Sequence, residues 1–201
     1  MRLKDKVSLI TGAGKGIGAA IARRFAAEGA KLVICDLNEE NIRAVVTELE
    51  NMGSQASGFV VDVTDMAAVE AMVKKALEKY ETIDILVNNA GIARDAMLHK
   101  MSEDDWDQVM NVNMKGTFNM TRVVVPIMRE KKAGRIVNVS SASRFGNAGQ
   151  SNYAASKEAI VGFTRSLSWE LGTKGITINA IAPGTIETDM YWGIPEGTRE
   201  V

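Results

Sequence analysis

Short apolar runs alternate with longer amphipathic segments along the chain, and this alternation predicts the fold. The runs are mostly continuous and rich in Val and Ile, which is typical of strands buried on both faces of a parallel sheet. Strict alternation of such strands with helices predicts an α/β fold with a doubly wound parallel sheet sandwiched by helices. Predicted strands cover residues 7–11, 31–35, 56–61, 84–88, 135–140 and 177–182, and predicted helices cover residues 17–28, 39–52, 66–80, 103–113, 117–132 and 153–173.

Composition narrows the class of protein. A chain of 201 residues with a net charge of −1 is typical of one globular domain, which we expect to span residues 1–201. The balanced charge predicts no nucleic-acid partner, and the lack of a run of about 18 apolar residues predicts no membrane span. No apolar leader precedes the first strand, and Cys35 is the only cysteine, so we expect a cytoplasmic protein without an intramolecular disulfide. His99 is the only histidine, and we expect no metal site.

A glycine-rich loop follows the first predicted strand and opens the first predicted helix. Glycines at this place let the backbone turn tightly and approach a pyrophosphate, which the free N–H groups of the helix N-terminus attract. The spacing fits Gly-x-x-x-Gly-x-Gly from Gly12, and it also fits Gly-x-Gly-x-x-Ala from Gly14. A glycine-rich turn without a ligand is the alternative, because a glycine motif alone is weak evidence. The dinucleotide-binding candidates in this loop are Gly12, Lys15, Gly16, Ile17 and Gly18.

Asp36 and Lys15 favour different coenzymes. Asp36 closes the second strand, where an acid accepts hydrogen bonds from the adenosine ribose and repels a 2′-phosphate. Lys15 favours NADP(H), because a lysine in the glycine loop can reach that phosphate. A desolvated like-charge contact costs more than a flexible surface lysine gains, so we favour NAD(H), with NADP(H) as the alternative. Asp36 could also serve in the N-cap region of the next helix.

Two more predicted strands end in polar motifs at the same edge of the sheet. Asp62-Val63 follows the third strand, where the carboxylate can accept from an adenine amino group. The fourth strand ends in Asn88, followed by Asn89, Ala90 and Gly91. The amides can tie neighbouring strand ends together, while the two small residues let a flat ring lie against the backbone.

Tyr153 and Lys157 are the candidates for acid–base chemistry. On a helix, residues i and i+4 share a face, so the ammonium would lie near the phenol. At about 4 Å and an effective dielectric of about 20, it would favour the phenolate by at most about 4 kcal/mol. That corresponds to roughly three pKa units, which brings a tyrosine into the range of general acid–base catalysis. Ser141, after the strand at 135–140, could hold a carbonyl oxygen beside Tyr153, although the Tyr-x-x-x-Lys pattern alone occurs in many helices.

Taken together, these motifs resemble the short-chain dehydrogenase/reductase family. They follow the family's order over nearly the whole chain: Thr11-Gly12 with Gly16-Ile17-Gly18, Asp62-Val63, Asn88-Asn89-Ala90-Gly91, Asn113, Ser141, Tyr153 with Lys157, and Pro183-Gly184. The resemblance implies a Rossmann fold and hydride transfer between a nicotinamide coenzyme and an alcohol or carbonyl.

The resemblance also implies roles for single residues. Tyr153 would be the acid or base, Lys157 would lower its pKa and bind the nicotinamide ribose, and Ser141 would orient the substrate oxygen. Asn113 would hold a water that continues the proton relay. Pro183, Gly184, Ile186 and Thr188 would border the nicotinamide. Alignment from the strand selects Ser141, but alignment from Tyr153 selects Ser140, and neighbouring strand residues face opposite ways. We favour Ser141.

Within the family, residues 89–95, 149–153 and 179–190 look most like 3-oxoacyl-[acyl-carrier-protein] reductases of fatty acid biosynthesis. The substrate would then be a 3-oxoacyl thioester, and an acidic acyl-carrier protein could dock on Lys131, Lys132 and Lys174, unless these are ordinary solvated lysines. Asp36 departs from the NADP preference of such enzymes and favours an NAD-linked sugar, steroid or other secondary-alcohol dehydrogenase. The helices after residue 103 and around Tyr153 form a dimer interface in the family, so we expect a homodimer or homotetramer.

The resemblance stops short of the family's last elements. Family members continue with a lid helix over the substrate, a further helix and a last strand. We therefore expect a sheet that lacks its last strand, with the strand at 177–182 as an exposed edge, and a pocket without its lid. A second hypothesis follows, a dinucleotide-binding module that has lost turnover.

Overall fold

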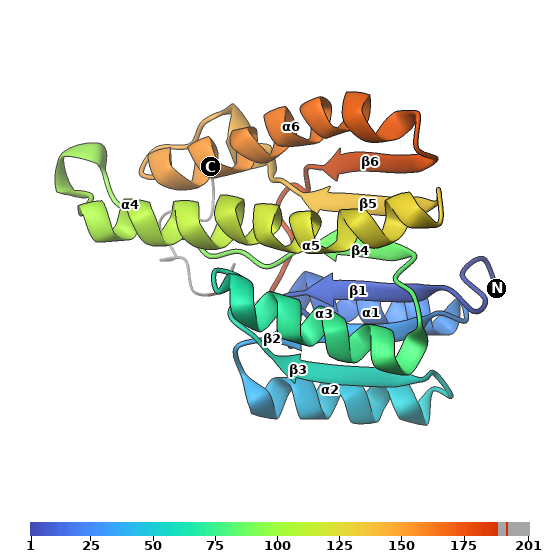
Figure 1. Cartoon of the computed structure of the whole chain (residues 1–201). Coiled ribbons are helices and arrows are strands. Elements are labelled where there is room, and N and C mark those ends of the chain that lie inside the picture. The colour runs from blue at the N-terminus through green and yellow to red at the C-terminus, as the bar shows by residue number, and fades with distance from the viewer. Residues whose placement is uncertain (189–191, 193–201) are drawn as a thin grey trace.

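Six parallel strands form one sheet in the order β3-β2-β1-β4-β5-β6 within the part of the chain that the computed structural model describes, residues 1–188 and 192 (Figure 1). The strands are β1 (Val7–Thr11), β2 (Lys31–Asp36), β3 (Ala56–Val60), β4 (Ile85–Asn88), β5 (Gly134–Val139) and β6 (Ile176–Ile181). This confirms the doubly wound parallel sheet, with β6 at one edge. The strand order reverses between β1 and β4, and in such sheets ligands bind beyond the carboxyl ends of the strands at that point.

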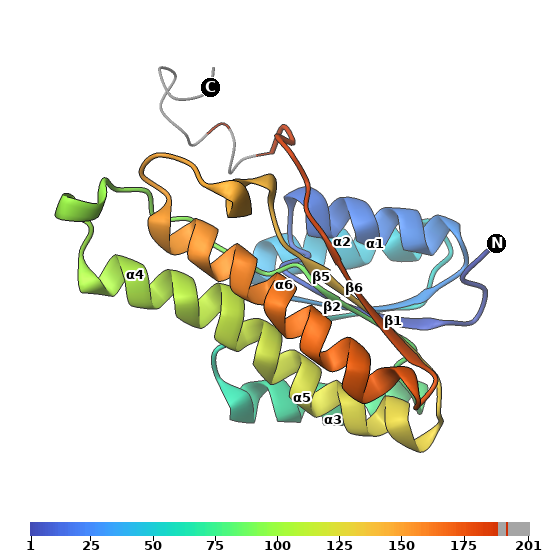
Figure 2. The same cartoon turned by 90° about the horizontal axis from the view of Figure 1, so that it is seen from above.

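Two layers of helices cover the sheet, as Figure 2 shows from above. The pair α1 (Gly16–Ala27) and α2 (Glu39–Asn51) lies on one face. The other face carries α3 (Met66–Tyr80), α4 (Glu103–Met110), α5 (Gly116–Glu130) and α6 (Ser151–Gly172). Apart from the end of α4, which lies three residues before the predicted one, helix and strand boundaries lie within about two residues of the predicted ones, which is the usual uncertainty of helix ends.

Each face of the sheet has its own hydrophobic core because successive strand residues point to opposite faces. Ile10 and Ile34 pack with the α1–α2 layer, in a cluster that includes Ala22 and Leu49. Leu9 packs in the other cluster, which includes residues of α3 and α5. The continuous burial of β1 confirms the prediction of strands covered on both faces.

The two helices predicted at 103–113 and 117–132 are one continuous rod. A π-helical turn, η2 (Asn111–Lys115), joins α4 to α5 without a break. Gly116 does not interrupt the helix; its missing side chain lets the rod approach Val63, because a Cβ there would lie 2.5 Å from Val63 Cγ2. A π turn inserts one extra residue per turn and often marks a functional site. The buried side chain that this turn carries is Asn113.

Candidate active site

The glycine loop is shaped by two left-handed residues. Gly12 and Gly16 have φ of 61° and 55°, a region that favours glycine. A Cβ on Gly12 would lie 2.8 Å from Ala90 Cα, and one on Gly18 would lie 2.2 Å from the Gly12 carbonyl oxygen. Of the two spacings given above, Gly-x-x-x-Gly-x-Gly from Gly12 is therefore the one that fits the backbone turn. The N-terminus of α1 opens directly after this loop, as dinucleotide binding requires.

Asp36 stands against the same loop. One carboxylate oxygen accepts from the Gly14 amide at 3.0 Å, and the other accepts from the Asn38 amide at 3.2 Å. Asn38, not Asp36, is the N-cap of α2, since its side chain accepts from the Asn41 amide. Asp36 still serves in the N-cap region, because it accepts from the amide of the N-cap residue. The carboxylate also fixes the shape of the glycine loop and gives its outer end a negative charge.

Asparagine amides tie the strand ends together, as predicted. Asn89 Nδ2 donates to the carbonyls of Thr11 and Gly12, both at 3.0 Å. Asn88 Nδ2 donates to Asn138 Oδ1 at 2.8 Å, which couples β4 to β5. The Thr11 hydroxyl accepts from the amides of Asn89 and Ala90, at 3.0 Å each. The carboxyl edge of the sheet is therefore cross-linked from β1 to β5 by side chains.

Asp62 and Val63 lie at the end of β3, but only Asp62 is exposed. Its carboxylate accepts from the Thr64 amide at 2.8 Å. Val63 is buried, and its carbonyl accepts from Asn119 Nδ2 at 2.9 Å. Val63 thus anchors the turn to α5, and its part in binding an adenine stays a prediction.

The two adjacent serines face different ways. Ser140 is buried, and its hydroxyl donates to the Lys157 carbonyl at 2.8 Å. Ser141 begins the short helix η3 (Ala142–Phe145), and its hydroxyl is hydrogen-bonded to the phenol of Tyr153. Ser141 is therefore the serine that shares a site with Tyr153.

Tyr153 and Lys157 lie on one side of α6, and burial is the largest influence on the pKa of both groups. Burial raises the pKa of the Tyr153 phenol, the Ser141 hydrogen bond lowers it, the Asp95 charge raises it, and the net result is a raised pKa. Lys157 Nζ donates to the Val139 carbonyl at 2.9 Å and lies 5.4 Å from the centre of the Tyr153 ring. Burial lowers the pKa of Lys157 to about 8. Lys157 is not among the groups that shift the Tyr153 pKa in the chain alone, where the amine faces the strand and the ring, and the predicted lowering of that pKa by Lys157 stays a prediction.

Asn113 is fully buried behind these residues. Its Oδ1 accepts from the Ile92 amide at 2.8 Å, while Nδ2 donates to the Ile92 carbonyl at 3.1 Å and to Ser156 Oγ at 2.9 Å. A Cβ on Gly91 would lie 3.1 Å from Asn113 Oδ1 and 3.3 Å from Lys157 Nζ. Gly91, Asn113 and Lys157 therefore meet at one point. The proton relay through a water at Asn113 stays a prediction.

The segment after β6 passes the same edge. The Pro183 carbonyl accepts from the Ala142 amide at 2.8 Å, which ties this segment to the Ser141 turn. A Cβ on Gly16 would lie 3.5 Å from Thr188 Cγ2, so Thr188 borders the glycine loop. Gly184 and Ile186, between these two contacts, are exposed. The predicted nicotinamide side of the site is thus brought next to both the glycine loop and Ser141.

The three lysines assigned to a carrier protein do not lie at this edge. Lys131 and Lys132 follow α5 and Lys174 follows α6, so all three precede strands at the amino edge of the sheet. Lys131 Nζ is bound to Asp84 Oδ1 at 2.6 Å and to the Ile83 carbonyl at 3.0 Å. A carrier protein docked on these lysines would therefore not lie beside the site of the same chain, since helices that return across the sheet end at its opposite edge.

Sequence reasoning missed two contributors to the site, Ser156 and Gln150. Ser156 links Asn113 to the Tyr153 carbonyl, to which its hydroxyl donates at 2.7 Å. Gln150 is buried, and its Nε2 donates to Asp95 Oδ2 at 2.8 Å. A polar residue one helical turn before Tyr153 was the available signal for Gln150, but nothing local showed that the Asp95 loop would reach it.

The arrangement combines a nucleotide cradle with an acid–base group. Gly12, Gly16 and Gly18 lie where side chains would obstruct the loop, Asp36 lies at its outer end, and Tyr153 lies beside Ser141 and Lys157. These residues fit a nicotinamide dinucleotide. Among residues 1–188 and 192 there is no cluster of three metal-ligating side chains, and none of the described helices is long and apolar enough to cross a membrane.

The chain belongs to the short-chain dehydrogenase family, whose model matches residues 6–198. Members are oxidoreductases that use NAD(H) or NADP(H). The chain is 49% identical to 3-oxoacyl-[acyl-carrier-protein] reductase FabG of Thermotoga maritima, over 100% of this chain and 82% of that protein. It is 47% identical to the (2S)-[(R)-hydroxy(phenyl)methyl]succinyl-CoA dehydrogenase subunit BbsD of Thauera aromatica, over 100% of this chain and 81% of that subunit.

Solved structures of two oxidoreductases match the fold of this chain. The crystal structure of levodione reductase matches with a TM-score of 0.91 and 41% identity, over 94% of this chain and 75% of that one. The structure of NAD⁺-bound xylitol dehydrogenase matches with a TM-score of 0.90 and 34% identity, over 92% and 72%. The Rossmann-like fold and the class of oxidoreductase predicted from the motifs are thereby confirmed, and the chain spans about four fifths of the length of the reductases it resembles.

Proposed function

We propose that this chain is a single dinucleotide-binding domain that reduces 3-oxoacyl thioesters with a nicotinamide coenzyme. The observation that carries the proposal is the meeting of Ser141, Tyr153 and Lys157 beside the glycine loop. The identity to a 3-oxoacyl-[acyl-carrier-protein] reductase supports this substrate class. When bound, the coenzyme exchanges a hydride with the substrate carbon.

The protein groups then handle the proton and the oxygen. The raised pKa of Tyr153 keeps its phenol protonated at neutral pH, which suits it to donate a proton to a carbonyl oxygen during reduction. Ser141 donates a second hydrogen bond to that oxygen and so orients it. Lys157 binds the nicotinamide ribose, and Asn113 holds the segment at Gly91 against which the ring rests.

NAD(H) is the favoured coenzyme because the Asp36 carboxylate faces the glycine loop, where it would repel a 2′-phosphate. The remaining contacts of the proposed cradle come from Lys15, Ile17, Asp62, Val63, Asn89, Ala90, Gly91, Pro183, Gly184, Ile186 and Thr188. Dissociation constants for NADH and NADPH, measured on the parent and on Asp36→Ala, test the preference. We expect tighter NADH binding in the parent and at least about a tenfold gain for NADPH in the variant; tighter NADPH binding by the parent would contradict it.

Sugars and other secondary alcohols are the alternative substrate class. Asp36 and the similarity to an NAD⁺-bound xylitol dehydrogenase both favour an NAD-linked dehydrogenase of sugars or other secondary alcohols. NADH oxidation with acetoacetyl-CoA, compared with NAD⁺ reduction by xylitol and by cyclic secondary alcohols, separates the two. Higher kcat/KM for the thioester supports our proposal, and the opposite order favours the alternative.

Two matched variants, Tyr153→Phe and the control Tyr80→Phe, test the role of the Tyr153 hydroxyl. Tyr80 is a buried tyrosine at the end of α3, at the amino edge of the sheet, and its hydroxyl is hydrogen-bonded to Ser57 at 2.9 Å. Removal of the Tyr153 hydroxyl should lower kcat by about 10²- to 10⁴-fold and spare NADH affinity. Removal of the Tyr80 hydroxyl should change stability only. Equal kcat values for the two variants would contradict the assignment of Tyr153 as the proton donor.

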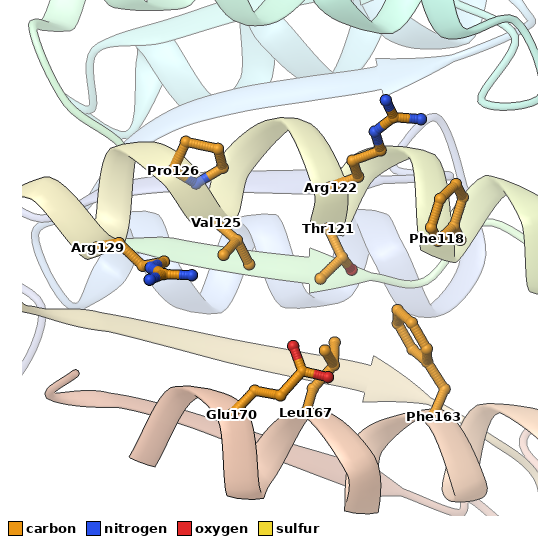
Figure 3. Close-up of a pocket in the computed structure, with 9 residues that line it drawn as sticks. All are labelled: Phe118, Thr121, Arg122, Val125, Pro126, Arg129, Phe163, Leu167 and Glu170. Atoms are coloured by element: carbon orange, nitrogen blue, oxygen red, sulfur yellow. The ribbon is translucent and has the colours of Figure 1, made fainter. Parts of the chain in front are cut away.

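We further propose that the chain forms a homodimer through α5 and α6, or a homotetramer made of two such dimers. A groove of about 530 Å³ lies between these helices (Figure 3). Phe118 and Val125 of α5 face Phe163 and Leu167 of α6 across it. Its rim carries Arg129 and Glu170, so the groove offers both charges to a second copy related by a two-fold axis.

Sedimentation velocity tests this interface. Leu167→Glu should break this interface, because the charge would be buried without a partner, and should convert a homodimer into monomers of 21.7 kDa or a tetramer into dimers. Leu37→Glu, at an exposed leucine after β2, is the matched control and should leave the assembly intact. A monomeric parent, or an unchanged Leu167→Glu assembly, would contradict the interface. An acyl-carrier protein as the substrate's carrier stays a proposal without an assigned docking surface.

A further inference from the structure

The segment that follows β4 is fastened to the start of α6, directly before Tyr153. The Ala96 amide donates to the Gly149 carbonyl at 2.9 Å. Asn152 Nδ2 donates to the Arg94 carbonyl at 2.9 Å, and Gln150 Nε2 donates to Asp95 Oδ2 at 2.8 Å. Residues 94–96 and 149–152 thus form a fixed wall beside the phenol, and the charged side chain held in that wall is Asp95.

The charge on Asp95 is not neutralised within the described residues. Its hydrogen-bond partner there is the neutral amide of Gln150, and none of the described cations lies within ion-pair distance of its carboxylate. Two cations of the elements that border the site have other partners, since the Arg144 guanidinium of η3 is paired with Glu158 at 2.7 Å and Lys157 of α6 donates to the Val139 carbonyl. The Arg94 side chain is exposed. The field of Asp95 reaches the reacting group, because its charge contributes to the raised pKa of Tyr153.

We propose that Asp95 is a specificity-determining residue that selects 3-oxo substrates with a neutral carbonyl group, such as a thioester, ester or amide, and disfavours free 3-oxo acids. This proposal deepens the reductase function proposed above and rests on it for the position of the substrate. The reacting carbonyl oxygen of the substrate lies at Tyr153 and Ser141. The acid group of a 3-oxo acid is only two bonds from that carbon, so it stays beside Asp95 in either orientation.

The size of the effect follows from Coulomb's law. Two like charges about 7 Å apart at an effective dielectric of about 20 repel strongly enough to weaken binding by roughly tenfold or more. Water screens part of this, because Asp95 is exposed in the chain alone. Gln150 is buried and fixes the carboxylate in place, so the charge cannot swing away from an anionic substrate.

The test compares acetoacetate with acetoacetamide, which have the same number of heavy atoms and differ in charge. We expect the parent to prefer acetoacetamide by about tenfold or more in kcat/KM with NADH. Asp95→Asn keeps an oxygen that can accept from Gln150 but removes the charge, so the preference should fall to within about threefold. The control Asp107→Asn removes a charge from an exposed residue of α4 and should keep the parent's preference.

A binding measurement tests the role of Asp95 even if neither compound is turned over. Dissociation constants of both compounds are measured by ligand-observed NMR with saturating NAD⁺, which cannot reduce them. If neither compound is reduced, the reductase function fails for this substrate class, and the ratio of dissociation constants still supports or overturns the role of Asp95. Equal affinities in the parent, an unchanged ratio in Asp95→Asn, or the same change in Asp107→Asn would each overturn it.

Discussion

Two lysines at opposite edges of the sheet have opposite electrostatic surroundings. At the amino edge, Lys131 donates to a carboxylate, to the Thr82 hydroxyl and to a backbone carbonyl. At the carboxyl edge, Lys157 donates to the Val139 carbonyl, and no carboxylate among the described residues pairs with it. Both amines are anchored to strand ends, and only one of them has a counter-ion.

The difference separates a structural ion pair from a group held ready for chemistry. Burial alone would raise the pKa of Asp84, but hydrogen bonds from Lys131 and from the Val7 amide outweigh it and hold the pKa below its ordinary value. Lys157 has no such compensation, and burial lowers its pKa to about 8. A buried cation without a counter-ion costs stability, and proteins retain such groups mainly where function requires them.

The largest expected effect comes from deleting the uncompensated amine. Lys157→Met should lower kcat by about 10²- to 10⁴-fold, because the group that orders the coenzyme ribose beside Tyr153 is lost. Lys131→Met should keep kcat within about twofold, since its contacts lie at the other edge. Steady-state NADH oxidation with acetoacetyl-CoA measures both. Similar losses of kcat in the two variants would contradict a functional role that is specific to Lys157.

The second prediction concerns stability and pH. The pKa of Lys157 is about 8 in the folded chain, against an ordinary value of 10.5. Below pH 8 the amine is protonated in both states, and the cost of burying its charge is fully present. Between pH 8 and 10.5 the unfolded chain binds more protons than the folded one, so stability rises with pH in this window. The full shift corresponds to roughly 3 kcal/mol.

Urea unfolding of the parent and of Lys157→Met across pH 7 to 10 measures this term. Tyr153 is present in both chains, so its own titration cancels in the difference to first order. The stability of the parent relative to the variant should increase from pH 8 upward. A pH-independent difference would show that Lys157 carries no buried-charge penalty.

The sequence predicted the framework and the identity of the site better than its electrostatics. Strand and helix positions followed from periodicity, the meeting of Ser141 with Tyr153 followed from motif order, and the shared face of Tyr153 and Lys157 followed from the i, i+4 rule. The pKa direction of Tyr153 did not, because it depends on burial and on Asp95, which lies 58 residues before it in the chain. The place of Lys131 at the amino edge did not follow for a related reason, since sequence spacing does not show which edge of the sheet a helix end reaches.

The smallest expected effect is at the amino edge. Asp84 accepts from Lys131 at 2.6 Å and from the Val7 amide at 2.9 Å, and both partners of the ion pair are largely buried. Lys131→Met should therefore lower the free energy of unfolding by about 1–3 kcal/mol at neutral pH, because a partly buried carboxylate loses its cation. Lys132→Met, at the exposed neighbouring lysine, is the control and should change it by less than about 0.5 kcal/mol.

Acid titration sharpens this last prediction. The pKa of Asp84 in the folded chain lies below its ordinary value of 3.8, so the stability that the ion pair contributes is present above that value and is lost as the pH falls through the folded pKa. The difference between the parent and Lys131→Met should accordingly shrink below about pH 4. A difference that persists in acid would mean that Lys131 acts through packing of its aliphatic chain, and the contrast with Lys157 would then be one of position and not of charge.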